Sequence, residues 1–360
     1  MLGAINRRRD AAMKIKKNMI LLAALSMAGR WPVSAQDQVV TTFSEPVHTM
    51  QYPEIICAGC IVPEWSNGYL LHHEIEKNAD PDTPMVTMYD REGKKMLTGR
   101  IWDPQSANVT VRTAGEARGG ILAGASGVMQ DGSIQGFLAR TDVTGRTVQS
   151  VHTGQSVPER VCEAADGTVW ALLTDPPERT GVIRHYSFEK GQLGSYLQLD
   201  SLARNGNEIT AIMSKSYLAC VKDRVVAYFG TSEYAEVDSG GKVQRRKVAN
   251  AGGLGKPTRG FAVTEDGRMF VGYQTESDRD DIQCMLYEVL AKGGDSTAIL
   301  RPVTGRVRAC CEGGAVPQDK TSGRLWGAIG NELVISGAGS WDLLWVKLEE
   351  SGNAAVLAEQ

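Results

Sequence analysis

The sequence predicts an all-β fold built from one repeated unit, and three observations support this. An Asp-Gly turn between two apolar runs occurs twice in the same register, as EAADGTVWALL at 163–173 and as VTEDGRMFVGY at 263–273. Glycine is abundant, with 40 residues in 360, which suits many tight turns. No long segment sustains the 3.6-residue apolar period of an amphipathic helix. Together these patterns favour many short strands.

Six stretches are predicted to be β-hairpins, because apolar and polar residues alternate around a turn closed by glycine, where positive φ costs little. They cover residues 85–99, 137–151, 182–199, 233–248, 285–300 and 343–357. Their turn glycines recur about fifty residues apart and are Gly93, Gly145, Gly191, Gly240, Gly293 and Gly352.

A second hairpin precedes each of these, most clearly at 163–173 and 263–273, with looser copies at 66–75, 222–230 and 322–330. Four strands per unit, repeated six times, predict a single six-bladed β-propeller of four-stranded antiparallel blades. Because one blade cannot bury both of its faces alone, the ring must close. We expect a strand at 37–43 to complete the last blade beside residues 352–357. A seventh, degenerate blade within residues 40–75 is the alternative.

The stretch DGTVW at 166–170 resembles the blade motif of NHL/TolB-like, two-component-regulator and streptogramin-lyase propellers. The resemblance covers most of the chain after residue 35 and implies a fold more than a function. Metal-dependent lactonases of this class begin the first inner strand with Glu-Gly-Pro-x-Trp, whereas CAGCIVPEWSNG at 57–68 has no acid at that place. Streptogramin lyase uses histidine chemistry, and no two of the five histidines of this chain fall at the same point of two blades.

The N-terminus is predicted to be a targeting segment. After a basic extension, lysines precede an apolar run at 19–28, and Val33-Ser34-Ala35 forms a small-residue cleavage site. This predicts an N-terminal extension with a cleaved signal peptide over residues 1–35 and a propeller domain over residues 36–360. The protein is therefore expected to be exported, to the periplasm or outside the cell. No later apolar run is long enough for a membrane span.

Charge limits the classes of partner. The chain has 39 basic and 42 acidic residues, and residues 1–35 hold seven of the basic residues and one of the acidic residues. The remaining chain therefore carries 32 basic and 41 acidic residues, a formal charge of −9. A body of this sign repels phosphate backbones and anionic membrane surfaces, so nucleic acid is not expected as a partner.

Propellers bind ligands where the innermost strands and their loops converge on the central channel. The innermost strands are predicted at 51–58, 116–124, 157–164, 206–213, 257–263 and 305–312. At comparable points they offer charged side chains for a ligand, namely Glu54, Arg118, Arg160, Glu208, Arg259 and Arg308.

Two interpretations of these six residues stay open. Guanidinium groups bind carboxylate or phosphate with paired hydrogen bonds, which predicts a site for a small anion. Alternatively the charges pair with one another, or with outer acids such as Glu159 and Asp166, and tie blades together. A shift of one residue in the alignment would turn a side chain to the other face.

Cysteines form a second set of candidates. Ring closure would bring Cys57 and Cys60 of the first inner strand near Cys310 and Cys311 of the last, so a disulfide across the seam is feasible in an exported protein. Buried thiols are the alternative, and a Cys₄ metal site is disfavoured because strand neighbours face opposite ways. Cys162, two residues after Arg160, is predicted to be a packing position. No metal ligands are assigned.

Two functions fit these features. The first is a secreted binding or scaffold propeller that takes a protein, peptide, glycan or small anion at its loop face. The second is a metal-dependent lactonase-like hydrolase or lyase acting on a small anionic substrate. It would use Glu54 and Glu208 with a divalent cation such as calcium. The cofactor itself is not identified by the sequence.

Overall fold

The computed structural model of the protein contains β-strands throughout its described part and no helix there. The residues that the structure describes are 40–50, 64–66, 69–74, 85–175, 180–199, 216–222, 224–229, 233–248, 260–274, 284–291, 297–305, 325–336 and 343–351. The predicted targeting segment at 1–35 lies outside them. Within these ranges, no helix is long and apolar enough to cross a membrane.

The chain divides into two compact units. Residues Thr41–Glu349 form one unit, which holds nearly all of the described strands. Residues Met1–Val40 and Glu350–Gln360 form the other, of which only the ends of two strands are described.

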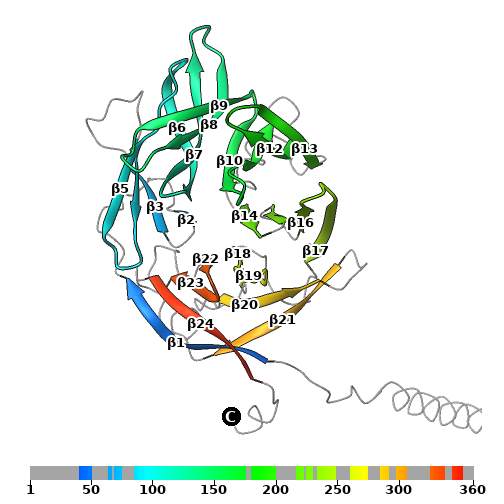
Figure 1. The fold of residues 1–360 in the computed structure, drawn as a ribbon. Coiled ribbons are helices and arrows are strands. Elements are labelled where there is room, and N and C mark those ends of the chain that lie inside the picture. The colour runs from blue at the N-terminus through cyan, green and yellow to red at the C-terminus, as the bar shows by residue number, and fades with distance from the viewer. Residues whose placement is uncertain are drawn as a thin grey trace, which may run out of the picture. The chain divides into compact units, whose positions relative to one another are not determined.

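The described strands fall into six groups of four (Figure 1). Three groups are separate sheets, and parallel pairing of outer strands joins the other three groups, here called the fourth, fifth and last sheets, into one twelve-stranded sheet. The first sheet contains β2 (Glu64–Ser66), β3 (Tyr69–Glu74), β4 (Met85–Tyr89) and β5 (Lys95–Arg100). The second contains β6 (Ser106–Ala117), β7 (Gly120–Met129), β8 (Ile134–Thr141) and β9 (Thr147–Gly154). The third contains β10 (Val157–Glu163), β11 (Val169–Asp175), β12 (Thr180–Ser187) and β13 (Gly191–Leu199).

The fourth sheet contains β14 (Tyr217–Val221), β15 (Arg224–Tyr228), β16 (Glu233–Asp238) and β17 (Val243–Val248). The fifth contains β18 (Phe261–Val263), β19 (Met269–Gln274), β20 (Cys284–Leu290) and β21 (Thr297–Gly305). The last contains β22 (Leu325–Ile329), β23 (Glu332–Ser336), β24 (Leu343–Ser351) and β1 (Val40–Met50).

The first strands of the sheets form a closed ring. β2 contacts β6, β6 contacts β10, and the series continues through β14 and β18 to β22, which contacts β2 again. Sheets whose innermost strands meet in this way form a β-propeller, so the predicted all-β propeller fold is confirmed. The number of blades stays a prediction.

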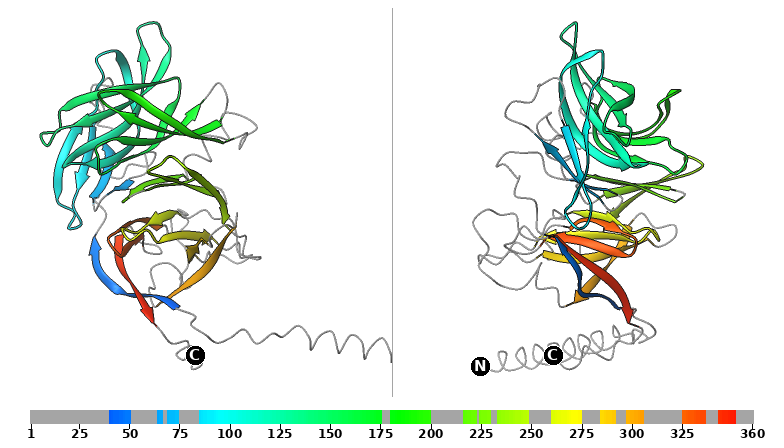
Figure 2. Two further views of the ribbon diagram at one scale, coloured as in Figure 1. Left: turned by 45° about the vertical axis from the view of Figure 1, so that its right-hand side comes forward. Right: turned by 60° about the vertical axis from the view of Figure 1, so that its left-hand side comes forward.

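The two ends of the propeller unit meet in one sheet, because β1 is hydrogen-bonded beside β24 (Figure 2). β1 starts three residues later than the strand predicted at 37–43. The predicted hairpin at 343–357 is a single strand as far as Ser351, and Gly352 lies outside the described residues. β1 also pairs in parallel with β21, which in turn pairs in parallel with β17, so these outer edges are covered.

The core lies in layers between consecutive sheets, and β11 shows how one strand serves two layers. Val169, Ala171 and Leu173 pack against the second sheet. Trp170 and Leu172, on the other face, pack against the fourth sheet. Because both faces are buried, the strand is a continuous apolar run and not an alternating one.

Three hairpin turns, β4–β5, β8–β9 and β16–β17, share a pattern in which an Asp side chain accepts hydrogen bonds from the turn backbone and the third residue after it is glycine. Gly93 and Gly145 have positive φ as predicted. In the β16–β17 turn it is Gly241 and not Gly240 that has positive φ. Asp238 Oδ1 accepts from the N–H groups of Gly240 and Lys242, which fixes this register. Gly191 also has positive φ, and Gly293 lies outside the described residues.

The innermost strands differ in part from those predicted. The predicted stretch 157–164 coincides with the innermost strand β10 and is correct. The last three residues of the predicted stretch 257–263 form β18. The stretch 116–124 is wrong, because it spans the β6–β7 turn and the innermost strand is β6. The other three predicted stretches, 51–58, 206–213 and 305–312, lie outside the described residues except Gly305, which ends β21.

Candidate functional site

Arg118 and Arg160 do not lie at comparable points. Arg118 is in the turn between β6 and β7, with φ of 48°, at one end of the innermost strand. Arg160 lies in the middle of β10, where its Nε donates to the carbonyl oxygen of Ser216 at 2.8 Å. One arginine thus lies in a turn after its innermost strand and the other in the middle of its innermost strand, so the predicted alignment of Arg118 with Arg160 is wrong.

Arg118 takes part in a contact between the second and third sheets. Its Nε lies 2.9 Å from Glu163 Oε1, and Arg140 Nη2 lies 2.7 Å from the same oxygen. Arg140 Nη2 also donates to the carbonyl oxygen of Gly167 at 2.9 Å. This is the role that the blade-tying interpretation predicts, with Glu163 as the partner. Asp166 is used locally, since its Oδ1 accepts from the Thr168 hydroxyl at 2.6 Å.

Matching β-bulges occur in the innermost strands of the second and third sheets. In β6 the register shifts between Val111 and Thr113, which leaves Arg112 as the extra residue. In β10 it shifts between Pro158 and Arg160, which leaves Glu159 as the extra residue. A bulge turns a side chain away from the strict alternation of the strand, and bulges are enriched beside functional sites.

Glu159 is largely buried, with the whole residue only 9% exposed. The hydroxyl of Thr174 donates to its Oε1 at 3.2 Å. Burial raises the pKa of Glu159, while the positive charges of Arg112 and Arg160 act in the opposite direction and only partly offset it. The carboxyl therefore holds its proton at a higher pH than a solvent-exposed glutamate does.

The two arginines beside Glu159 differ in how they are held. Arg160 donates to the Ser216 carbonyl and, through Nη1, to the backbone carbonyl of Glu159. Arg112 is exposed and, among the residues that the structure describes, makes no hydrogen bond or ion pair. An exposed guanidinium and a buried carboxyl therefore lie at bulges of neighbouring innermost strands, and the charge of Arg112 acts on Glu159.

Close packing fixes the segment that leads into this site. A Cβ atom on Gly136 of β8 would lie 2.2 Å from the carbonyl oxygen of Ser156. Ser156 is buried, its hydroxyl donates to Asp175 Oδ2 at 3.4 Å, and Arg184 Nη1 donates to Ser156 Oγ at 2.9 Å. This polar chain holds the start of β10 and, with it, the bulge at Glu159.

Arg112 and Glu159 were missed from the sequence because strict period-two alternation places them elsewhere. The available signals are the stretches VTVRTAG at 109–115 and VPERV at 157–161, in which the alternation breaks at the bulged residue. Glu159 was interpreted as an outer acid for the same reason.

A disulfide joins Cys162 of β10 to Cys220 of β14, with a Cα–Cα distance of 5.7 Å. The prediction that Cys162 is only a packing position is wrong. The sequence does not predict this pairing, because its pattern places the innermost strand of the fourth sheet at 206–213, whereas β14 at 217–221 carries Cys220. Next to the disulfide, Trp170 stacks on His185 with ring centroids 4.2 Å apart.

The other predicted candidates lie outside the described residues and stay predictions: Glu54, Glu208, Arg259, Arg308, Cys57, Cys60, Cys310 and Cys311. In the described part of the chain, no group of three or more His, Cys, Asp or Glu side chains is placed to hold a metal ion. The hydrolase or lyase alternative, in which Glu54 and Glu208 act with a divalent cation such as calcium, stays a prediction as well.

Comparisons with known proteins give likeness of fold only. No family model and no curated protein matches the chain. A periplasmic gluconolactonase from Pseudomonas aeruginosa is 14% identical, with 82% of this chain and 79% of that chain covered and a TM-score of 0.39. A protein of unknown function from Dyadobacter fermentans is 12% identical, with 88% and 98% covered and a TM-score of 0.44. The WD40 domain of Toxoplasma gondii coronin is 7% identical, with 88% and 87% covered and a TM-score of 0.40.

Proposed function

We propose that this protein is an exported binding propeller that recognises a small carboxylate or phosphate at Arg112, Glu159 and Arg160. The observation that carries the proposal is the pair of bulges, which places an exposed guanidinium and a buried carboxyl on neighbouring innermost strands. Positions on the innermost strands are those at which propellers gather ligand contacts from several blades.

The chemistry of the three groups favours an anionic ligand. The Arg112 guanidinium offers a fork of donors that matches a carboxylate or phosphate. Arg160 adds a second positive charge that is already fixed by its backbone partners. Glu159, whose pKa is raised, donates a hydrogen bond to the anion when protonated and accepts one from a ligand hydroxyl when ionised.

Titration calorimetry with malate and with inorganic phosphate tests this proposal. Arg112→Gln should weaken binding of the better ligand by about 10- to 150-fold, because a charged hydrogen bond contributes about 1.5–3 kcal/mol. Arg146→Gln, at an exposed arginine in the β8–β9 turn, makes the same change of charge away from the site and should leave binding unchanged. Absence of binding to the parent protein, or equal binding by the two variants, contradicts the proposal.

Export rests on the N-terminal sequence pattern, and a disulfide such as Cys162–Cys220 fits an oxidising compartment. The NHL/TolB-like subtype stays a prediction from the DGTVW motif at 166–170. A protein, peptide or glycan partner at the loop face is compatible with the same scaffold role. The hydrolase or lyase alternative requires a cation at Glu54 and Glu208, and calcium that survives dialysis in a one-to-one ratio would favour it.

A further inference from the structure

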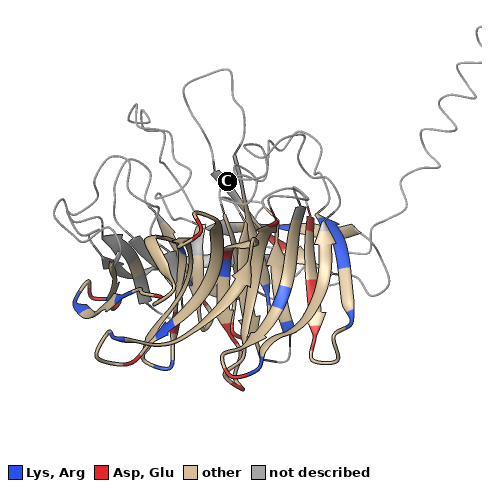
Figure 3. Cartoon of the chain, turned by 90° about the horizontal axis from the view of Figure 1, so that it is seen from above, with Lys and Arg blue, Asp and Glu red and all other residues tan. Residues whose placement is uncertain are grey.

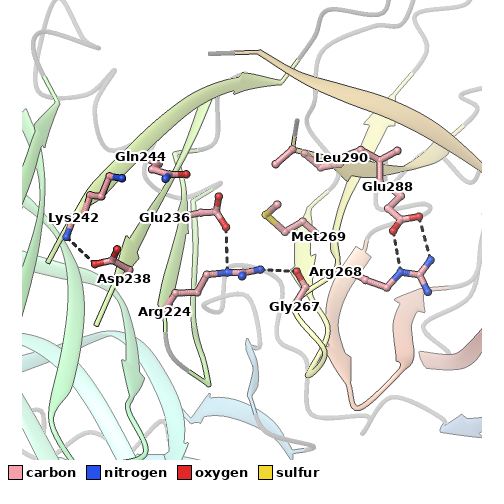
Figure 4. Close-up of a pocket in the computed structure, with 12 residues that line it drawn as sticks. Arg224, Glu236, Asp238, Lys242, Gln244, Gly267, Arg268, Met269, Glu288 and Leu290 are labelled. Carbon is pink, nitrogen blue, oxygen red and sulfur yellow. Dashed lines mark hydrogen bonds and ion pairs between the residues drawn. The ribbon is translucent and has the colours of Figure 1, made fainter. Parts of the chain in front are cut away.

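A groove lies between the fourth and fifth sheets, away from the bulges of the second and third. Its volume is about 510 Å³, within the usual range for small-molecule sites. Figure 4 shows Arg224 and Glu236 of the fourth sheet on one side of it and Met269 of the fifth sheet on the other. Arg224 links the two sides, because its Nη2 donates to the carbonyl oxygen of Gly267 at 2.9 Å.

The charged side chains that line the groove are balanced in number. Three are basic and three are acidic, namely Arg224, Lys242 and Arg268 against Glu236, Asp238 and Glu288. Burial raises the pKa of Glu288, but the hydrogen bonds from Arg268 and Arg301 lower it by more, so this carboxyl is ionised at neutral pH. Charges of both signs also alternate along the edge that carries the hairpin turns (Figure 3). A ligand with a net charge of either sign therefore gains no preference from the groove.

The fourth-sheet side of the groove offers hydrogen-bonding atoms of both kinds. Gln244 Oε1 accepts from Arg246 Nη2 at 2.8 Å, whereas Gln244 Nε2 makes no hydrogen bond with any residue that the structure describes. Arg224 Nη1 likewise makes none within the described ranges. Glu236 supplies the acceptors, since Arg224 Nε lies 3.1 Å from its Oε1 and Arg246 Nε lies as far as 3.8 Å from its Oε2. Donors and acceptors for a ligand thus share one wall.

The fifth-sheet side combines one matched ion pair with an apolar lining. Arg268 Nε lies 2.9 Å from Glu288 Oε1, so these two charges already serve each other. Met269 and Val289 are buried, and Leu290 and Ala291 continue the apolar lining toward solvent. A CH-rich surface placed on Leu290 and Ala291 would remove them from water.

The ring of a neutral sugar matches both walls. Each hydroxyl group donates and accepts hydrogen bonds, so neighbouring hydroxyls can use Gln244 Nε2, Arg224 Nη1 and the Glu236 carboxylate without bringing a charge. The CH groups of the ring form an apolar face that suits Leu290 and Ala291. We propose that the groove binds a neutral sugar, with its hydroxyls against the fourth sheet and its CH face against the fifth.

Ligand-observed NMR titrations with the methyl glycosides of glucose, galactose and mannose test this inference. At least one of them should bind the parent protein, because the three present the hydroxyls of the second and fourth ring carbons in both orientations. The uronic acid and the amino sugar of the same hexose add a negative and a positive charge to that ring and should bind no more tightly. Sorbitol, which has the hydroxyls but no ring face, should bind severalfold more weakly.

Two glutamine substitutions locate the binding. Gln244→Ala should weaken binding of the best glycoside by about 2- to 10-fold, the range expected for one neutral hydrogen bond. Gln149→Ala is the matched control, because Gln149 also lies on the last strand of its sheet and its Oε1 accepts from an arginine, Arg140 Nη1, at 3.1 Å. Gln149 does not line the groove, so this variant should bind as the parent does.

Four results would overturn the inference. They are no binding of any of the three glycosides, tighter binding of the uronic acid or the amino sugar than of the neutral glycoside, binding of sorbitol as tight as that of the ring, and equal binding by the two glutamine variants. Arg112→Gln should leave sugar binding unchanged, so this site and the one at the innermost strands succeed or fail separately.

Discussion

The disulfide between Cys162 and Cys220 joins the innermost strands of two neighbouring sheets, and its removal has a calculable effect. The cross-link closes a loop with a sequence separation of 58, for which the chain-entropy relation gives a stabilisation of about 4 kcal/mol. The double variant Cys162→Ala/Cys220→Ala should therefore lose up to about 4 kcal/mol of unfolding free energy. Because the unfolding entropy is about 2.1 cal/mol/K per residue, a loss of about 4 kcal/mol in the unit Thr41–Glu349 corresponds to a fall in Tm of about 6 °C.

Urea unfolding followed by circular dichroism measures this loss. The double variant is a cleaner perturbation than a reductant, which would act on every disulfide of the chain. Dithiothreitol should lower the stability of the parent and change that of the double variant less. If the double variant unfolds at the parent's urea midpoint with an unchanged slope, the covalent tie between β10 and β14 does not stabilise the fold and the reasoning fails.

Three further substitutions test the packing and the charges. Gly136→Ala should cost about 1–3 kcal/mol in urea unfolding, because its Cβ would meet a backbone carbonyl of the β9–β10 loop, and an unchanged midpoint would contradict that contact. Glu159→Gln should raise Tm at pH 7. Because the pKa of the Glu159 carboxyl is raised in the folded protein, ionisation of this group lowers the stability of the parent at pH 7. The difference in Tm between variant and parent should therefore close as the pH falls through that pKa. A variant with a lower Tm than the parent at pH 7 would contradict this. Glu288→Gln should cost about 3–5 kcal/mol at pH 7, because it removes the charge of a buried carboxylate that Arg268 and Arg301 both contact. The pKa of Glu288 is lowered in the folded parent, so the stability difference between parent and variant should shrink as the pH falls through that pKa. A stability difference that does not change with pH would exclude the ion pairs as its cause.

The hairpins could be predicted from the sequence because their signals are local. Gly93, Gly145 and Gly191 have the positive φ that an L-residue resists, so glycine at these places marks a turn without tertiary information. Gly241 was misassigned as Gly240, because two adjacent glycines give the same local signal. The hydrogen bonds of Asp238 select between them.

The site could not be predicted in the same way, because its register depends on other strands. Arg112 and Glu159 are placed by bulges, and a bulge is a mismatch between two strands that neither strand shows alone. The sequence pattern places Arg118 on an innermost strand, whereas β6 ends at Ala117 and Arg118 lies in the turn that follows. The pairing of Cys162 with Cys220 depends on which strand is innermost in the fourth sheet, and no local pattern identifies that strand.

The two Asp-Gly turns one hundred residues apart share a further role that their sequence does not state. The carbonyl oxygen of Gly167 accepts a hydrogen bond from Arg140 of the preceding sheet, and that of Gly267 accepts one from Arg224 of the preceding sheet, each at 2.9 Å. A side chain at either glycine would collide with an arginine side chain of the preceding sheet. The repeat therefore specifies a contact between sheets as well as a turn within one.

Closure of the last sheet by β1 is the central claim of the fold, and paired N-terminal deletions test it most directly. Thermal unfolding of a chain lacking residues 1–39 should be cooperative with the parent's Tm, because β1 and its pairing with β24 remain. A chain lacking residues 1–50 should lose the cooperative transition or unfold at a much lower temperature. Cooperative unfolding of that shorter chain at the parent's Tm would contradict a ring closed by its N-terminal strand.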